Sequence, residues 1–330
     1  MVRFALSLPP EPTEMWTLGQ QMGVTHAITG FPRGRPDQPF KPDYVPFVQM
    51  VKRFEDAGYT VAGIESNPPF MEKVKLGLPG RDEAIEQASE LVSYMGAVGI
   101  PIWCYNWMAA ISWLRTSTTT RTRGGALVTS YDHSLMLKAP LTEHGVVTDE
   151  QLWGNLAYFL TRIVPVAEKA KVKLAIHPDD PPLSPIRGIA RVLRNPEAFQ
   201  RVIDLVPSPY NGITFCQGCF AEMGVDIPAQ VRHFTGQGKL FFAHFRTVRG
   251  TAERFEECFH DDGDTNMYQA MKAYVDAGFD GPMRPDHVPT MAGDPNDHAG
   301  YTNRGRLYAI GYMRGLHEAI LAQRAAAGKS

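Results

Sequence analysis

The stretch Leu174–Pro182, which reads LAIHPDDPP, decides the fold that we predict for this chain. Three apolar residues lead directly into a histidine, two acids and two prolines. A short apolar run stopped by proline is typical of a buried parallel strand rather than a helix. We therefore expect His177 where such a strand ends and its loop begins. Pro178 restricts the backbone that follows, which helps to hold the imidazole in place.

Apolar runs of the same kind recur along the chain and alternate with helical stretches. The predicted strands are Arg3–Leu8, Thr25–Thr29, Val61–Ser66, Ile102–Asn106, Lys173–His177, Ile213–Cys216, Leu240–Arg246 and Pro282–His287. The predicted helices are Glu14–Met22, Tyr44–Ala57, Arg81–Val98, Asp149–Ala170, Pro196–Leu205, Ala229–Phe234, Met267–Ala277 and Gly305–Ala326. Strands that alternate with helices in this way predict an α/β fold, a single (β/α)8 TIM barrel over residues 1–330.

The longest irregular segment is 107–148, between the fourth strand and its helix. It contains Arg115, a Ser/Thr run at 116–120, Arg121, Arg123 and a Gly-Gly pair. A loop of this length within a compact domain is usually functional or disordered. We expect an insertion that forms a lid over the top of the barrel, and a disordered surface excursion is the alternative.

Composition excludes several classes of protein. The chain has 330 residues, 44% hydrophobic and 21% charged, and a formal net charge of -2. Interspersed charges of both signs argue against a nucleic-acid-binding face and against electrostatic attachment to a membrane. No segment reaches the roughly 20 apolar residues of a membrane span. Four cysteines without the framework of a small secreted domain favour a reducing cytoplasm.

Each of the last four predicted strands ends with a potential metal ligand. These residues are His177, Cys216, His244 and Asp286. The C-terminal ends of barrel strands meet at one rim, where barrel enzymes keep their active sites. A single histidine at a strand end is more often structural than a ligand, but four ligand types at four consecutive strand ends are hard to explain by packing.

Nitrogen and thiolate ligands by themselves would suggest zinc. Cys219 follows Cys216 at C-x-x-C spacing, which also occurs in zinc knuckles and redox pairs. Because the chain has no second C-x-x-C, we expect Cys216 to be the ligand and Cys219 to be a loop thiol. Cys104 and Cys258 are interpreted as small buried hydrophobic residues.

Candidate acid–base and substrate-binding groups surround the four ligands. His287 follows Asp286 directly, and Tyr301 lies in a Gly-rich loop before the last helix. Arg246 and Arg284 lie two residues from a ligand and suit a substrate carboxylate, although ion pairing in the barrel with Glu65 or Asp179 is nearly as plausible. Two further candidates for substrate binding are Asn106 and Arg115.

From about residue 64 onward, the chain resembles the mannonate dehydratase family, the metal-dependent sugar-acid lyases of hexuronate degradation. The matching motifs are IES (64–66), KLGLPGRD (75–82), CYN (104–106), IHPDDPP (176–182), NGITFCQG (211–218), HFR (244–246), DGDTNMY (262–268), GFDGPMRPDH (278–287) and GYTNRGR (300–306). The resemblance implies a xylose-isomerase-like barrel. It further implies that His177, Cys216, His244 and Asp286 bind a divalent ion, usually manganese, with zinc, iron or cobalt as alternatives. His287 and Tyr301 would be the proton-transfer pair.

Two segments depart from the family pattern. Where the family has a histidine before KLGLP, this chain has Met71, and where it has an aspartate after CYN, this chain has Ser112. We expect both positions on loops that face the pocket. They leave open a sugar acid other than mannonate.

The function expected from this resemblance is a cytoplasmic hydro-lyase that removes water from an aldonate, D-mannonate giving 2-keto-3-deoxy-D-gluconate. A metal-dependent sugar isomerase or epimerase on the same barrel is the main alternative. A metal-dependent endonuclease would want a basic face, and a sugar-acid binder would not need an acid–base pair. The expected partner is a small sugar acid, with neither nucleic acid nor membrane, and we expect a homo-oligomer, a dimer or a tetramer.

Overall fold

A closed barrel of parallel strands forms the centre of the molecule. The computed structural model describes residues 2–32 and 40–327, and within them eight strands close the barrel in the order β1-β12-β9-β8-β7-β4-β3-β2. The strands are β1 (Arg3–Ser7), β2 (His26–Thr29), β3 (Thr60–Glu65), β4 (Ile102–Asn106), β7 (Lys173–His177), β8 (Asn211–Cys216), β9 (Leu240–Phe245) and β12 (Pro282–Pro285). The predicted barrel is thus confirmed.

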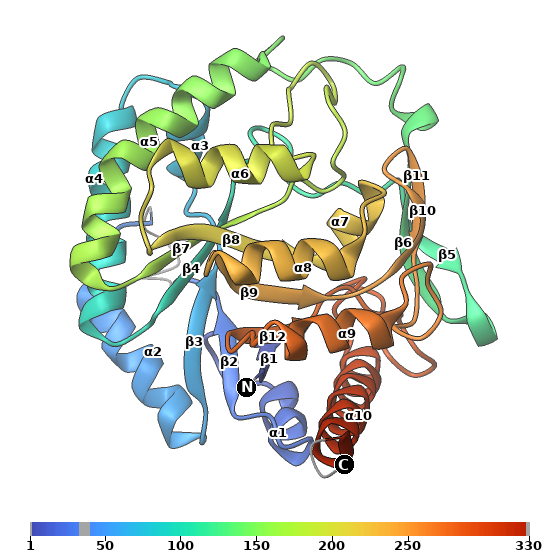
Figure 1. The fold of residues 1–330 in the computed structure, drawn as a ribbon. Helices are drawn as coiled ribbons and strands as arrows, with labels where there is room; N and C mark the ends of the chain where they lie inside the picture. The colour runs from blue at the N-terminus through green and yellow to red at the C-terminus, as the bar shows by residue number, and fades with distance from the viewer. Residues whose placement is uncertain (1, 33–39, 328–330) are drawn as a thin grey trace.

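Helices surround the barrel (Figure 1). They are α1 (Glu14–Gln21), α2 (Tyr44–Asp56), α3 (Met71–Leu76), α4 (Arg81–Ala97), α5 (Asp149–Ala170), α6 (Pro196–Leu205), α7 (Gln217–Glu222), α8 (Ile227–Gly236), α9 (Met267–Asp276) and α10 (Asn303–Ala327). Eight of them match the predicted helices to within a few residues. The short helices α3 and α7 were not expected, since six residues give too little periodicity to recognise.

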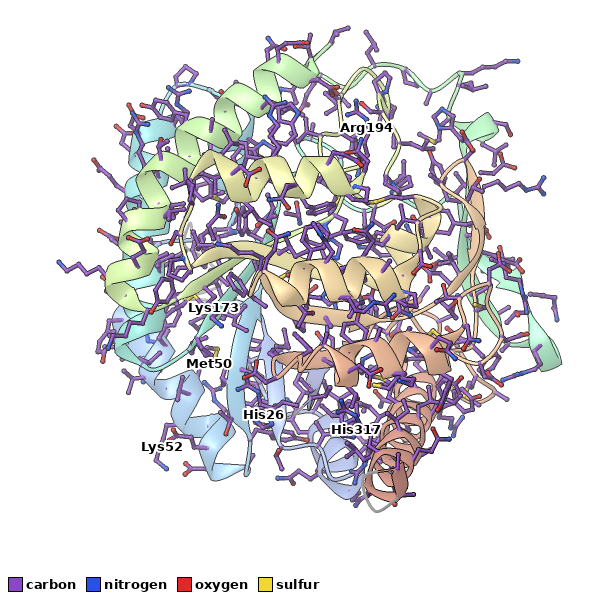
Figure 2. All side chains as sticks on the ribbon, in the orientation of Figure 1. His26, Met50, Lys52, Lys173, Arg194 and His317 are labelled. Atoms are coloured by element: carbon purple, nitrogen blue, oxygen red, sulfur yellow. The ribbon has the colours of Figure 1, made fainter. Side chains whose placement is uncertain are left out.

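The helix α2 shows how a local pattern positions the outer layer. The side chain of Asp43 accepts a hydrogen bond from the backbone N–H of Val45 and caps the start of the helix. Met50 is fully buried against the barrel, whereas Lys52 stands on the outer surface, where it pairs with Asp56 (Figure 2). The chain then turns through Gly58 at φ 75°, a conformation that favours glycine, and enters β3.

A second, smaller sheet lies beside the barrel, at the right in Figure 1. Its four antiparallel strands are β5 (Ser117–Arg121), β6 (Leu127–Asp132), β10 (Val248–Thr251) and β11 (Arg254–Glu257). The segment 107–148 therefore contains two strands rather than the disordered excursion that was the alternative to a lid. Its role as a lid over the top of the barrel stays a prediction.

Close packing between neighbouring barrel strands explains why β8 contains Gly212. A Cβ atom at this position would overlap the carbonyl oxygen of Lys239 and lie 2.5 Å from the ring of Phe241. Adding atoms to a packed interior forces neighbouring groups out of their preferred positions. The absence of a side chain at Gly212 therefore allows β8 and β9 to approach each other.

We expect Gly212→Ala to lower the free energy of unfolding by about 1–3 kcal/mol, the usual cost of overpacking. Gly154→Ala is the matched control, because an added Cβ there meets nothing within 4 Å and alanine favours the helix α5. Denaturant unfolding of both variants measures the difference. Equal stability of the two variants would contradict this account of β8.

Candidate active site

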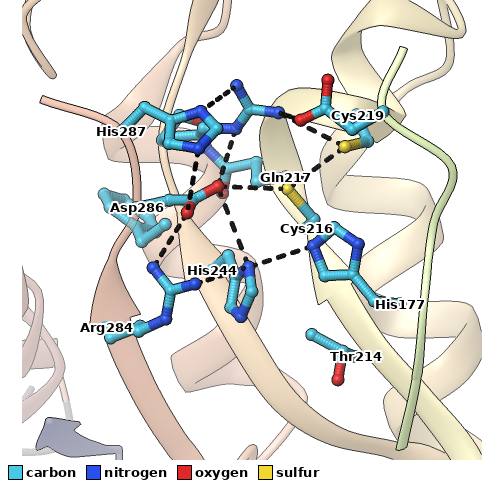
Figure 3. A network of polar contacts seen from close by, with 12 residues as sticks. His177, Thr214, Cys216, Gln217, Cys219, His244, Arg284, Asp286 and His287 are labelled. Atoms are coloured by element: carbon cyan, nitrogen blue, oxygen red, sulfur yellow. Dashed lines mark hydrogen bonds and ion pairs between the residues drawn. The ribbon is translucent and has the colours of Figure 1, made fainter. Parts of the chain in front are cut away.

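The four predicted metal ligands lie at the C-terminal rim of the barrel. His177 and Cys216 are the last residues of β7 and β8, His244 is the penultimate residue of β9, and Asp286 follows β12. Because these strands are parallel and adjacent, their ends bring the four side chains together (Figure 3). The ligand atoms of His177, Cys216 and His244 lie within 4.8 Å of one another. Their binding of a metal ion stays a prediction.

The distances between the ligand atoms suit a single ion. Nε2 of His177 lies 3.3 Å from Nδ1 of His244, and Sγ of Cys216 lies 3.4 Å from Oδ2 of Asp286. Nδ1 of His244 lies 3.8 Å from the same carboxylate oxygen. Bonds of about 2.0–2.3 Å to a tetrahedral ion require ligand atoms about 3.3–3.8 Å apart. The residues present fit a divalent metal ion.

The electrostatics of the site also suit a cation. Burial alone would raise the pKa of the Cys216 thiol, but the hydrogen bond donated by Cys219 and the charge of Arg246 hold that pKa well below its usual range. Burial likewise opposes protonation of His177, yet the hydrogen bond and charge of Cys216 raise its pKa to about 9. The lowered pKa of Cys216 favours its thiolate form, and the raised pKa of His177 indicates negative charge around it. Negative charge at this position attracts a cation.

Cys219 is not the loop thiol that was expected. It lies in the helix α7, and its Sγ is 3.3 Å from Sγ of Cys216. Burial raises its pKa well above the usual value, and the neighbouring Cys216 adds to the effect. Cys219 therefore stays protonated and donates to the ligand sulfur. Cys104 and Cys258 are buried, as predicted.

His287 and Tyr301 stand side by side above the four ligands. Their rings are perpendicular, with centroids 5.2 Å apart, and the Tyr301 hydroxyl lies 3.4 Å from Oδ1 of Asp286. Burial raises the pKa of Tyr301 well above its usual value, and the charge of Asp286 acts in the same direction. The phenol therefore keeps its proton near neutral pH.

A cavity of about 180 Å³ opens over these groups. His177, Asp286, His287 and Tyr301 line it, together with Glu65, Ser66, Cys104, Tyr105, Asn106, Met108, Ser112, Trp113, Asp180 and Arg284. Cys216 and His244 are fully buried and are not among its lining residues. Two of the four predicted ligands, His177 and Asp286, therefore line the cavity together with the acid–base candidates.

Asn106 faces the cavity in a fixed orientation. Its Oδ1 accepts hydrogen bonds from Lys75 Nζ at 3.4 Å and from the backbone N–H of Met108 at 3.2 Å. Asn106 is among the residues that line the cavity. Lys75 lies in the KLGLPGRD motif and is itself buried.

Of the two positions that depart from the family pattern, Ser112 lines the cavity, as expected. Met71 does not, because it begins α3 and is fully buried in the hydrophobic core. The expectation of a pocket-facing loop at Met71 was therefore wrong. The short helix that contains it turns the side chain inward.

The three candidate substrate-binding arginines are held by carboxylates of the protein. Arg284 donates to Glu65 at 2.7 and 2.8 Å, and Arg115 contacts Asp180 and Glu257 at 2.5 and 2.7 Å. These contacts match the ion-pairing alternative for Arg284. Asp179 pairs with neither Arg246 nor Arg284 among the contacts of the described residues, and its Oδ2 accepts instead from the backbone N–H of Leu193.

Arg246 is the most enclosed of these arginines. It is fully buried and does not belong to the cavity lining given above. Its guanidinium lies 2.9 Å from both Asp180 and Asp286 and 3.3 Å from Glu222, and it also pairs with Glu257. Its contact with substrate therefore stays a prediction that this geometry does not favour.

Sequence reasoning missed two residues that contact His287. Glu257 lies 2.8 Å from its Nδ1, and the Trp113 ring lies against the imidazole with centroids 5.0 Å apart. Strand alternation places Glu257 on the same buried face as Phe255, but RFEE (254–257) was not recognised as a strand. Trp113 carried no signal beyond its place in the long insertion.

A closed eight-stranded barrel with ionisable groups gathered at its C-terminal rim has the architecture of a barrel enzyme. The model of the family described as D-mannonate dehydratase (UxuA) matches residues 20–144 and 136–327. Mannonate dehydratase of Thermotoga maritima is 35% identical over 336 residues, with 90% of each chain covered. Mannonate dehydratase 2 of Halalkalibacterium halodurans is 35% identical over 298 residues, 82% of this chain and 86% of that protein. The chain belongs to the D-mannonate dehydratase family, a family of hydro-lyases.

Solved structures agree with this assignment. The crystal structure of mannonate dehydratase from Streptococcus suis serotype 2 superposes with a TM-score of 0.89 at 31% identity and covers 99% of this chain and 95% of its own. A D-tagatose 3-epimerase-like protein has a TM-score of 0.65 at 11% identity, with 97% and 99% covered, and shares the fold alone. The xylose-isomerase-like barrel is thus confirmed. Among the described residues, no helix is both long and apolar enough to cross a membrane.

We expect His177→Ala and Asp286→Asn to lose the bound metal, because each change removes one of four converging ligand atoms. His26→Ala is the matched control, since His26 begins the parallel strand β2, whereas the proposed ligands lie where the barrel strands end. Elemental analysis of purified protein after loading with Mn²⁺ measures the metal content. Full metal content in both ligand variants would contradict this assignment.

Proposed function

We propose that this protein removes water from D-mannonate and releases 2-keto-3-deoxy-D-gluconate, with a divalent metal ion held by His177, Cys216, His244 and Asp286. The observation that carries the proposal is the cluster formed by the ligand atoms of His177, Cys216 and His244, with Asp286 in contact with Cys216 and His244. The cluster adjoins the cavity that His287 and Tyr301 line. Membership of the D-mannonate dehydratase family supports the reaction. Sugar isomerases and epimerases share the fold with this chain at much lower identity.

The electrostatics of the described site support a bound cation. Hydrogen bonds and nearby opposite charges hold the pKa of each of five groups below its usual range, against burial, and these groups are Glu65, Asp180, Cys216, Glu257 and Asp286. The guanidinium groups of Arg115, Arg246 and Arg284 pair with the carboxylates among them. Because buried negative charges need compensation, this group of carboxylates and a thiolate favours a cation beside it.

The bound ion would stabilise the negative charge that develops on a sugar acid as its C2 proton leaves. Manganese is the metal that the family resemblance implies, whereas the thiolate by itself favours zinc. Iron and cobalt also accept this mixed ligand set. Measuring the turnover of the protein loaded with each of these metals in turn shows which one supports the reaction best.

His287 and Tyr301 supply the two proton transfers. The reaction takes the proton from C2 and expels the hydroxyl from C3 as water, and the enol that remains tautomerises to the keto acid. Tyr301 keeps its proton near neutral pH and is suited to protonate the leaving hydroxyl. His287 is then the base. Asn106 and Ser112 face the same cavity and would contact the hydroxyl groups of the sugar.

The four free cysteines support the cytoplasmic location expected from the sequence. The proposed partner is a small sugar acid. A homo-oligomer, dimer or tetramer, stays a prediction.

Incubating metal-loaded protein with a panel of hexonates tests the proposed reaction. We expect D-mannonate to give a 2-keto-3-deoxy acid, 18 mass units lighter by the loss of one water. Turnover of another hexonate alone would move the assignment to a different sugar acid. A stereoisomer of unchanged mass would replace the dehydratase by an isomerase.

We expect Tyr301→Phe to keep its metal and to lose about 10²–10⁴-fold in kcat, the usual contribution of a positioned acid or base. Tyr308→Phe is the control, because this hydroxyl contacts Arg123 at the surface rather than the cavity. Steady-state kinetics and metal analysis measure both properties. Wild-type turnover by Tyr301→Phe would remove this residue from the mechanism.

A further inference from the structure

The two ring nitrogens of His287 differ in their contacts. Nδ1 lies 2.8 Å from Oε1 of Glu257, 3.1 Å from Arg246 and 3.3 Å from Arg115. Both arginines also contact the same Oε1 atom of Glu257. Oε1 of Glu257 is therefore in contact with three nitrogen groups, the imidazole of His287 and the two guanidinium groups.

Hydrogen-bond chemistry decides which of these atoms carry protons. A guanidinium only donates, and an ionised carboxylate only accepts. A bare Nδ1 lone pair would face the negative oxygen of Glu257 at 2.8 Å, which is repulsive. Nδ1 therefore carries the proton and donates it to Glu257, and the two arginines donate to the same oxygen.

The other ring nitrogen is left for the substrate. Among the described residues, the nearest ion-pair partner of Nε2 is Oδ1 of Asp286 at 4.0 Å, beyond hydrogen-bonding distance, and His287 lines the cavity. Trp113 lies against the ring at a tilt of 35°, and Tyr301 meets it edge-on. The ring is thus fixed, with Nε2 directed at the cavity.

We propose that Glu257 is a positioning residue: it accepts the Nδ1 proton of His287, selects this tautomer and leaves the Nε2 lone pair free to take the proton of the substrate. The identity of that substrate rests on the proposed function, whereas the tautomer does not. The role is that of a carboxylate behind a catalytic histidine, which holds the imidazole in the correct orientation.

The proposal gives the small sheet beside the barrel a chemical role. Glu257 is the last residue of β11, which pairs with β10 and with β6. The side chain is almost completely buried, although the neighbouring Glu256 is half exposed and pairs with Arg249. Two adjacent glutamates on one strand therefore face different environments, which provides a matched control.

The tautomer is measured directly in the wild-type protein. Protein with ¹⁵N-labelled histidine is loaded with diamagnetic Zn²⁺, and long-range ¹H–¹⁵N correlation spectra are recorded between about pH 6 and 9, where histidine usually titrates. The spectrum of His287→Gln assigns the resonances. We expect a neutral ring protonated at Nδ1. A neutral ring protonated at Nε2, or a ring with both protons throughout, overturns the proposal.

Kinetics of Glu257→Gln test the consequence. The glutamine keeps the size of the side chain but loses the charge that draws three donors to one oxygen. We expect kcat to fall at least about tenfold, within the contribution of a positioned base, while KM changes less than about twofold. Glu256→Gln should keep wild-type values, and metal content and thermal unfolding of both variants are measured alongside.

The outcomes separate this proposal from the proposed function. If wild-type protein fails to dehydrate any hexonate, the reaction is wrong, and the spectra still decide the tautomer. If wild-type protein is active and Glu257→Gln keeps its kcat, Glu257 has no positioning role while the reaction stands. If Glu257→Gln does not fold, the wild-type spectra alone confirm or overturn the proposal.

Discussion

The guanidinium of Arg246 is the constraint on which the rest of the site depends. It is fully buried, and a buried charge is tolerated only when opposite charges and hydrogen bonds surround it. Its partners come from four separate segments, with Asp180 after β7, Glu222 in α7, Glu257 at the end of β11 and Asp286 after β12. Satisfying this one cation therefore brings four parts of the rim together.

Arg246 links the proposed metal-binding residues with the proposed acid–base residues. Asp286 contacts Arg246 through the same oxygen that approaches Cys216 and His244, so the arginine holds a proposed metal ligand in place. Glu257 contacts Arg246 and His287 at once, so the arginine also supports the acid–base side. Replacing Arg246 would therefore leave buried carboxylates without this cation on both the metal-binding side and the acid–base side.

Sequence patterns were sufficient to predict the barrel and to place the four proposed ligands at its rim, because both depend on local signals. Each strand is a short apolar run, and a parallel strand delivers the residue at its end to the rim. The positions of His177 and Cys216 at the rim follow from this rule alone. Among the partners of the arginines, Glu65 was named as an alternative for Arg284, whereas Asp180, Glu222 and Glu257 were not named as partners of Arg246, because residue type does not reveal which carboxylate faces which cation in three dimensions.

The small sheet escaped prediction for a related reason. Ser117–Arg121, with the sequence STTTR, has no alternation of polar and apolar residues, and its partner β6 pairs with β11, which lies far away in the sequence. Because β11 was not predicted, the buried position of Glu257 was not predicted either. Cys219 was assigned to a loop because α7 follows β8 without any linker, and a helix of six residues is too short to predict.

Pairing between β6 and β11 also joins segments that are distant in the chain. Tyr131 lies opposite Phe255 in this pair, although the strands β7, β8 and β9 come between them in the chain. Closure of the barrel joins still more distant segments, because β1 pairs with β12. Pairings that are distant in sequence tend to slow folding. The glutamate behind His287 is therefore positioned by a contact that no local segment of the chain can form on its own.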